Sequence, residues 1–186
     1  KRTFEALTEL IQETADDIQY LESISNALDI ALSEADLAQI KEELMQSGYI
    51  RRKHTKKKVK LTSKPMHYIS SDGYDMYVGK NNLQNEELTF SFANGNDWWF
   101  HAKGAPGSHV IVKSGGDELP DRTFEEAGRL AAYYSMNRGA DKVEIDYIQK
   151  KHVKKPNGAK PGFVVYYTNY SLVIDSDISN IKNVQD

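Results

Sequence analysis

The sequence predicts an α+β protein: a mostly antiparallel sheet with helices packed on one face, preceded by an α-helical coiled-coil arm. Two observations predict this division: residues 1–48 have apolar side chains at helical spacing, whereas residues 49–186 alternate strand-like runs with turn residues. The charge divides at the same point, with 3 Lys/Arg against 11 Asp/Glu in the first segment and 21 against 16 in the second. We expect a helical arm over 1–48, a basic linker over 49–65, the α+β domain over 66–178 and a tail over 179–186.

The composition excludes several classes of protein. The absence of cysteine rules out disulfide scaffolds, thiolate zinc sites and cysteine nucleophiles, and it suits a reducing cytoplasm. No apolar run approaches the ~18 residues that a membrane helix needs, so we expect no membrane insertion. The first residues, Lys1 to Phe4, include neither an initiator Met nor an apolar signal core, so we expect a soluble, cytoplasmic fragment of a longer protein.

The arm carries a hydrophobic stripe with alternating spacings of three and four residues, the a/d pattern of a heptad repeat. Its members are Phe4, Leu7, Ile11, Thr14, Ile18, Leu21, Ser25, Leu28 and Leu32. Such a stripe fits either the core face of a bundle helix or one strand of a coiled coil, and its four unbroken heptads favour the coiled coil. We expect it to pair with a segment upstream of this sequence, or, without that partner, with a second copy or with residues 34–47.

A second, shorter helix is expected after Ser33. Ser33 and Asp36 have the spacing of a capping box, in which each side chain bonds the backbone N–H of the other residue. Gly48 would end the helix, because glycine takes the left-handed conformation without a steric penalty.

The junction after this helix is basic. Residues 51–64 include eight Lys/Arg, one His and no acid. This pattern fits a solvated linker or a contact with phosphate, and Pro65 marks the start of the folded domain.

Strands, tight turns and two helices are expected to alternate in the α+β domain. Runs 66–70 and 74–79 are predicted strands around Ser71-Asp72-Gly73, because Asp-Gly is a strong hairpin turn. The further elements expected in order are a short helix over 81–92, strands over 97–102 and 108–112, a helix over 123–137, and last strands over 142–148, 162–167 and 171–174.

Asp97, His101 and His109 are the residues that suggest chemistry. If the strands at 97–102 and 108–112 form a hairpin, positions 101 and 109 lie opposite each other and both imidazoles share one face with Asp97. A metal would need a further ligand at suitable spacing, and a nucleophilic triad would need a serine in a recognisable turn. Because neither is evident, we expect no metal and no catalytic residue.

Two interpretations of the histidine pair stay open. The imidazoles could hydrogen-bond each other and pack against Trp98 and Trp99. Alternatively they could line an anion site, together with Lys103 and the backbone N–H groups of Gly104 and Gly107.

The second candidate surface is the loop at residues 149–162. Residues 147–174 contain no acid, and the loop holds five lysines: Lys150, Lys151, Lys154, Lys155 and Lys160. Four tyrosines lie close by in sequence, at positions 147, 166, 167 and 170. Lysines among aromatic residues suit single-stranded nucleic acid, although strand alternation would bury about half of these tyrosines.

The turn at residues 79–85 is a third candidate. Lys80, Asn81, Asn82 and Asn85 place a lysine and several amides where a strand meets a helix, and such groups can bind an anion. Asparagines at this position are also common helix caps.

Six separated motifs follow one another along the chain. They are Ser71-Asp72-Gly73, Val78-Gly79-Lys80-Asn81-Asn82 with Gln84-Asn85, Asp97-Trp98-Trp99-Phe100-His101-Ala102, Gly107-Ser108-His109-Val110, Ala131-Ala132-Tyr133-Tyr134-Ser135, and Lys151-His152-Val153-Lys154-Lys155-Pro156-Asn157-Gly158-Ala159-Lys160-Pro161-Gly162. Together they resemble the C-terminal R domain of the NFACT family over roughly residues 66–175. The acidic arm is similar to the family's middle coiled coil in position and character.

The resemblance implies ribosome-associated quality control. In that family the full protein binds a large ribosomal subunit with an obstructed nascent chain, recruits tRNA and supports C-terminal alanine tailing, and the R domain is considered RNA-binding. Relatives in Gram-positive cocci are also described as surface adhesins. A fibronectin- or fibrinogen-binding protein, at the cell surface without a signal peptide, is therefore the alternative.

We predict a non-catalytic, cytoplasmic, ribosome-associated RNA-binding module without a cofactor, with large-subunit RNA and tRNA as its partners. The residues expected to bind RNA or another anion are Lys80, Asn81, Asn82, Asn85, Trp98, His101, Lys103, His109, Lys150, Lys151, Lys154, Lys155 and Lys160. The turn residues would contact phosphate or ribose, the histidines would line an anion pocket beside Trp98 or Trp99, and the loop lysines would supply the electrostatic footprint.

Overall fold

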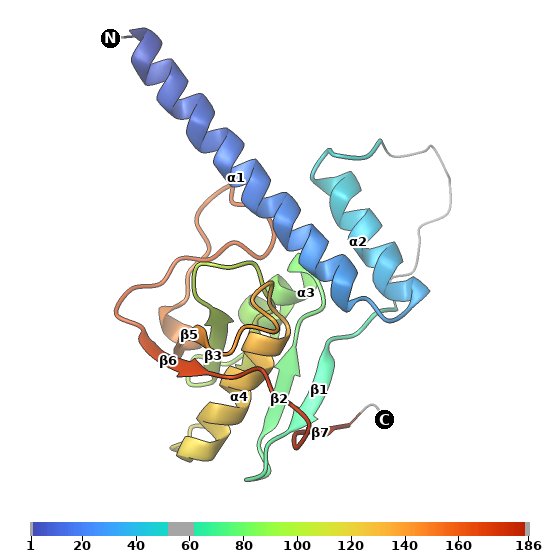
Figure 1. The fold of residues 1–186 in the computed structure, drawn as a ribbon, viewed down its shortest axis with the longest axis vertical. Helices are drawn as coiled ribbons and strands as arrows, with labels where there is room; N and C mark the ends of the chain where they lie inside the picture. The colour runs from blue at the N-terminus through green and yellow to red at the C-terminus, as the bar shows by residue number, and fades with distance from the viewer. Residues whose placement is uncertain (1, 52–61, 185–186) are drawn as a thin grey trace.

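The computed structural model describes residues 2–51 and 62–184, so most of the predicted basic linker lies outside the described residues. In the described ranges the chain forms four α-helices and seven strands (Figure 1). The helices are α1 (Arg2–Ile30), α2 (Glu34–Gln46), α3 (Asn82–Glu87) and α4 (Asp121–Tyr133). The strands are β1 (Met66–Ile69), β2 (Asp75–Val78), β3 (Trp98–Ala102), β4 (Val110–Val112), β5 (Val143–Gln149), β6 (Tyr170–Ile174) and β7 (Lys182–Asn183).

The strands of the described chain form one seven-stranded antiparallel sheet in the order β6-β5-β3-β4-β2-β1-β7. The hairpin between β1 and β2 closes through the predicted Asp-Gly turn, where Gly73 takes a φ of +88°. The predicted α+β class with a helical N-terminal segment is therefore confirmed.

The predicted break between the two N-terminal helices is also confirmed. The Ser33 hydroxyl accepts a hydrogen bond from the Asp36 backbone N–H at 3.2 Å, and the Asp36 carboxylate accepts one from the Ser33 N–H at 3.1 Å. This capping box starts α2, and Gly48, with a φ of +81°, turns the chain beyond its end.

The two faces of α1 have different surroundings. Tyr20, Ile24 and Ala27 are buried and form a small core with Ile40 of α2. The predicted heptad stripe faces away from this core: Phe4 is 76% exposed and Ile11 is 69% exposed. Figure 1 shows the N-terminal part of α1 projecting beyond the sheet, while its C-terminal part lies against the rest of the protein.

Both faces of the sheet are covered. As predicted, a helix packs on one face: α4 buries Ala127 and Leu130 against strand residues such as Phe100 and Val110. The structure adds a cover on the opposite face, where Leu88 of a π-helical turn (Leu88–Phe92) and the segment after β5 pack on Trp99, Ile111 and Ile148. The second cover positions the candidate site described below.

The predicted strand over 162–167 is wrong. In the described chain this segment makes an isolated bridge, between Lys154 and Val165, and no regular ladder. Gly158 and Gly162 take φ values of +75° and +78°, which an extended strand does not allow. The segment instead crosses the sheet as part of its second cover. The additional strand β7 pairs with β1 in the region expected to be a tail.

Candidate nucleic-acid interface

The two histidines lie together, as the hairpin argument predicts. β3 and β4 pair in a register that matches Trp98 with Val112 and Phe100 with Val110, so the next step brings His101 beside His109. Their ring centroids are 5.4 Å apart and the rings are nearly perpendicular. Trp99 lies on the same face, stacked on His101 at 5.6 Å.

Trp98 is not part of this arrangement. Side chains alternate along a strand, so Trp98 points to the opposite face, where its ring meets Phe124 of α4 at 4.9 Å. Asp97 shares the histidine face but is ion-paired with Lys113 and accepts the Asn94 backbone N–H at 2.7 Å. Of the two tryptophans, only Trp99 stands beside the histidine pair.

Both imidazoles are neutral at neutral pH. Burial lowers the pKa of His101 to about 4. Burial, and then the neighbouring His101, hold the pKa of His109 well below its ordinary value. The Nδ1 atom of His109 lies 2.8 Å from the Thr89 hydroxyl, and its backbone N–H donates to Asn85 at 2.9 Å. The pair therefore supplies neutral hydrogen-bonding groups and no positive charge.

A cavity of about 440 Å³ opens next to the histidines. Three segments form its walls: the β3–β4 loop at 104–107, the loop at 158–164 together with Tyr166, and the α1 residues Asp16, Gln19, Tyr20 and Ser23. Lys103 does not reach this space, because its Nζ atom is paired with Glu144 at 2.5 Å on the exposed side of the sheet. The contribution of α1 was not predicted, because sequence spacing does not relate residues 16–23 to the histidine hairpin.

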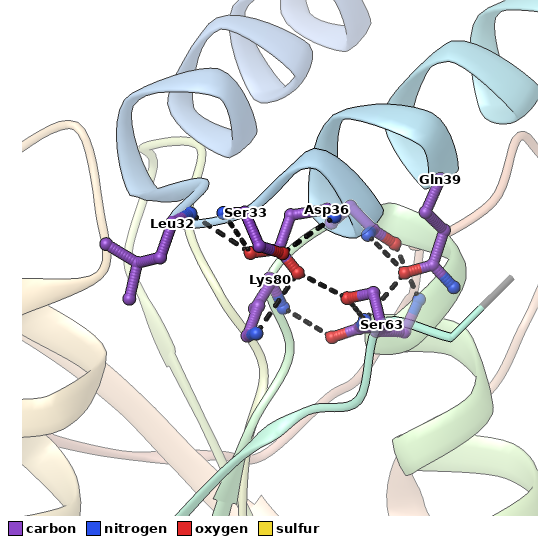
Figure 2. Close-up of polar contacts among 8 residues, drawn as sticks. Leu32, Ser33, Asp36, Gln39, Ser63 and Lys80 are labelled. Atoms are coloured by element: carbon purple, nitrogen blue, oxygen red, sulfur yellow. Dashed lines mark hydrogen bonds and ion pairs between the residues drawn. The ribbon is translucent and has the colours of Figure 1, made fainter. Parts of the chain in front are cut away.

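The side chains of Lys80 and Asn81 bond residues of α2, and Figure 2 shows Lys80 pointing toward Asp36. Lys80 Nζ is paired with the buried Asp36 at 3.1 Å. The Asn81 side chain caps α3 by accepting the Gln84 backbone N–H at 3.0 Å, and it donates to Gln39 at 2.8 Å. The polar groups of both residues are thus bound to the arm in this structure, and their expected contact with phosphate stays a prediction.

Asn82 and Asn85 are also buried and internally bonded. The Asn82 amide donates to Ser23 at 2.7 Å and to Glu43 at 2.8 Å, and the Asn85 amide donates to the Gly107 carbonyl at 3.3 Å. They line the cavity and hold its walls together. Lys80, Asn81 and Asn82 thus join the arm to the domain, whereas Asn85 bonds within the domain.

The five loop lysines fall into two groups. Lys155 is paired with Glu86 at 2.6 Å, and Lys160 is paired with Asp17 of α1 and lies 4.7 Å from the centre of the Tyr20 ring. Lys150, Lys151 and Lys154 have no carboxylate partner within residues 2–51 and 62–184. These three are therefore the loop lysines that are available to a phosphate chain.

Two of the four nearby tyrosines are partly buried and two are exposed, but strand alternation does not cause this division, because Tyr166 and Tyr167 lie outside the strands and Tyr147 pairs with Tyr170 across β5 and β6. Tyr147 packs against Phe100 at 5.4 Å, and Tyr166 donates a hydrogen bond to Asp146 at 2.9 Å. Tyr167 is 75% exposed and Tyr170 is 59% exposed. The bridge between Lys154 and Val165 brings the lysine segment next to the segment that carries these exposed rings.

The described residues hold neither a cluster of metal ligands nor a helix that could span a membrane. Over residues 2–51 and 62–184 no group of three or more His, Asp or Glu is placed to hold a metal ion. None of the described helices has the length and apolar character that a membrane span requires.

Comparison with known proteins places this geometry in context. The family model described as "NFACT protein RNA binding domain" matches residues 64–168, and the model described as "NFACT N-terminal and middle domains" matches residues 1–63. The chain is 44% identical, over its whole length, to a Rqc2 homolog RqcH of Streptococcus pneumoniae, of which it covers 33%. It is 38% identical to a Rqc2 homolog RqcH of Bacillus subtilis, with 97% of this chain and 32% of that protein covered.

A solved structure is also similar. The chain is 42% identical to the C-terminal part of the fibronectin/fibrinogen-binding protein from Streptococcus suis, with a TM-score of 0.89. The match covers 97% of this chain and 73% of that one. The chain spans about a third of the length of the curated relatives it matches.

Proposed function

The chain belongs to the NFACT family, and from this membership we propose that it is the RNA-contacting part of a ribosome-associated quality control protein. Its proposed partners are the RNA of the large ribosomal subunit and tRNA, and the whole protein would support C-terminal alanine tailing of stalled nascent chains in the cytoplasm. The role proposed for this part is binding and not catalysis.

The observation that carries the proposal is a group of loop lysines without a carboxylate partner among the described residues, on a segment bridged to the one that precedes the exposed Tyr167. Lys150, Lys151 and Lys154 lie in a stretch without acids, so a phosphate chain would meet no repulsion from the same segment. Tyr167 offers an exposed ring on which an unpaired base can stack, and Tyr170, which stacks on Tyr147, is 59% exposed. These residues lie in or next to the segment matched by the RNA-binding family model.

A charge-matched pair of variants tests the proposal on the 186-residue chain. Replacing Lys150, Lys151 and Lys154 by alanine should weaken binding to tRNA and to large-subunit RNA. It should also reduce the slope of log affinity against log salt by roughly 2 to 3, about one for each lost phosphate contact. Replacing three exposed lysines elsewhere is the control: Lys41, Lys142 and Lys182. Equal affinities and slopes for the two triple variants would refute the proposed interface.

A second candidate function is binding to fibronectin, because the similar Streptococcus suis structure carries that description. β6 is an edge strand of the described sheet, and Tyr170 and Val173 on it are exposed, so an extended peptide could add to this edge. Such a contact would depend little on salt and would not need the loop lysines. Fibronectin binding that persists at high salt in the lysine triple variant would favour this candidate.

A further inference from the structure

We propose that the cavity beside His101 and His109 binds one unpaired nucleobase of an RNA chain whose phosphates lie outside, on the loop lysines. The inference rests on the proposed RNA-binding function and adds to it a defined place for a single base. Three observations support it: the shape of the cavity, its charge, and the position of the lysines relative to its wall.

The shape suits a flat, uncharged group. A volume of about 440 Å³ falls within the range of ordinary small-ligand pockets and exceeds what a phosphate ion needs. Phe163, which is 47% exposed, and Tyr166 contribute aromatic surface to the lining, and Pro106 and Pro161 add apolar surface, whereas the Tyr20 ring already contacts Lys160 and Tyr49. Aromatic faces of this kind are what unstacked bases pack against in single-stranded complexes.

The charge of the lining disfavours a phosphate inside. Both imidazoles are neutral at neutral pH because they are buried, and the ammonium group of Lys160 is paired with Asp17. Asp16 adds a carboxylate to the same wall. An anion in the cavity would therefore meet an acid and no unpaired cation, whereas a neutral base would meet no such penalty.

Polar groups remain for the edge of a base. Gln19 lines the cavity, and its amide makes no hydrogen bond to any residue that the structure describes. A glutamine amide offers a donor and an acceptor side by side, as the hydrogen-bonding edge of a base does.

The lysines lie along a path that leads to the cavity. Lys154 forms a β-bridge with Val165, between the cavity-lining residues Val164 and Tyr166, whereas Lys150 and Lys151 lie at the other end of β3, where their backbone N–H groups donate to Asp97 and Gly95. The cavity wall at residues 158–164 is fixed to the domain, because the Gly162 backbone N–H donates to Glu86 at 3.3 Å and Lys155 pairs with the same carboxylate. A chain lying on these three lysines could thus turn one base into the cavity.

The first test uses the unmodified 186-residue chain and two small probes. Adenosine, which is neutral, should shift the imidazole C2–H resonances of His101 and His109 in a saturable NMR titration at pH 7. Inorganic phosphate should not. Shifts with phosphate and none with adenosine would overturn the inference and identify an anion site.

The second test fills the cavity. Ala159→Phe should weaken binding of a single-stranded RNA octamer about tenfold, because the base loses its stacking site. The salt slope should stay unchanged, because the lysines are intact. Ala140→Phe, at an exposed turn outside the cavity, is the control and should bind as the unmodified chain does.

The outcomes separate this inference from the proposed function. If the octamer binds with a lysine-dependent salt slope, but Ala159→Phe has no effect and adenosine is silent, the base site is refuted and RNA binding stands. If the octamer does not bind the unmodified chain at all, the proposed RNA-binding function itself is refuted.

Discussion

The histidine pair should make the protein less stable in weak acid, and the size of the effect follows from the structure. In the unfolded chain an imidazole has a pKa near 6.5, whereas burial lowers the pKa of folded His101 to about 4. As the pH falls below 6.5 the unfolded state takes up a proton that the folded state refuses, so stability is lost until the pH reaches about 4. Between pH 7 and pH 5, His101 alone should remove roughly 2 kcal/mol, and His109 acts in the same direction.

Urea unfolding at pH 7 and pH 5 measures this loss. Burial raises the pKa of Glu43, so protonation of this carboxyl stabilises the folded protein as the pH falls, which opposes the effect of the histidines. The unmodified chain alone therefore does not isolate the contribution of the histidines. His101→Gln removes the titrating group, and its pH-dependent loss should be smaller by roughly 2 kcal/mol. His152→Gln, at an exposed position in the lysine loop, controls for removing a histidine. Equal losses in the two variants, or an NMR pKa near 6.5 for His101, would refute the reasoning.

Contacts within the arm, within the domain and between the two give three further predictions, all measurable by urea unfolding at pH 7. Asp36→Ala should cost about 3 kcal/mol, because it removes a cap of α2 and leaves a largely buried lysine unpaired; a loss below about 1 kcal/mol would contradict the pairing. Gly162→Ala should cost about 2 kcal/mol, since φ is +78° and a Cβ atom would meet α3 at 2.9 Å. Gly158→Ala, with positive φ but open space, should cost less. Tyr20→Phe should cost about 1 to 2 kcal/mol, because buried Glu43 loses a hydrogen bond of 2.9 Å.

Features set by neighbouring residues could be predicted from the sequence. The capping box at Ser33 and Asp36 depends on a spacing of three residues, and the Asp-Gly hairpin depends on a single turn. The pairing of His101 with His109 needed only the assumption of a hairpin, because antiparallel register then fixes which residues face each other.

Features set by distant residues could not be predicted. Glu86 lies 69 positions before Lys155 and Asp17 lies 143 positions before Lys160, so an acid-free loop in the sequence becomes partly neutralised in the fold. Similarly, Asn81 was recognised as a possible cap, but only the packing of α2 on this turn explains why its amide is unavailable. Local composition overestimated the free positive charge because it cannot show which chain segments meet.

The cavity and the heptad stripe use different faces of α1. At 3.6 residues per turn, the heptad stripe and the cavity-lining residues of α1 lie on nearly opposite faces of the helix. The stripe residues Ile18 and Leu21 are 54% and 43% exposed, whereas Tyr20 between them is buried against α2 and beside the cavity. The pair of Lys160 with Asp17 further fixes the rotation of α1 relative to the lysine loop. A helix that paired with the stripe would therefore lie on the far side of α1, and such pairing would leave the proposed base site open.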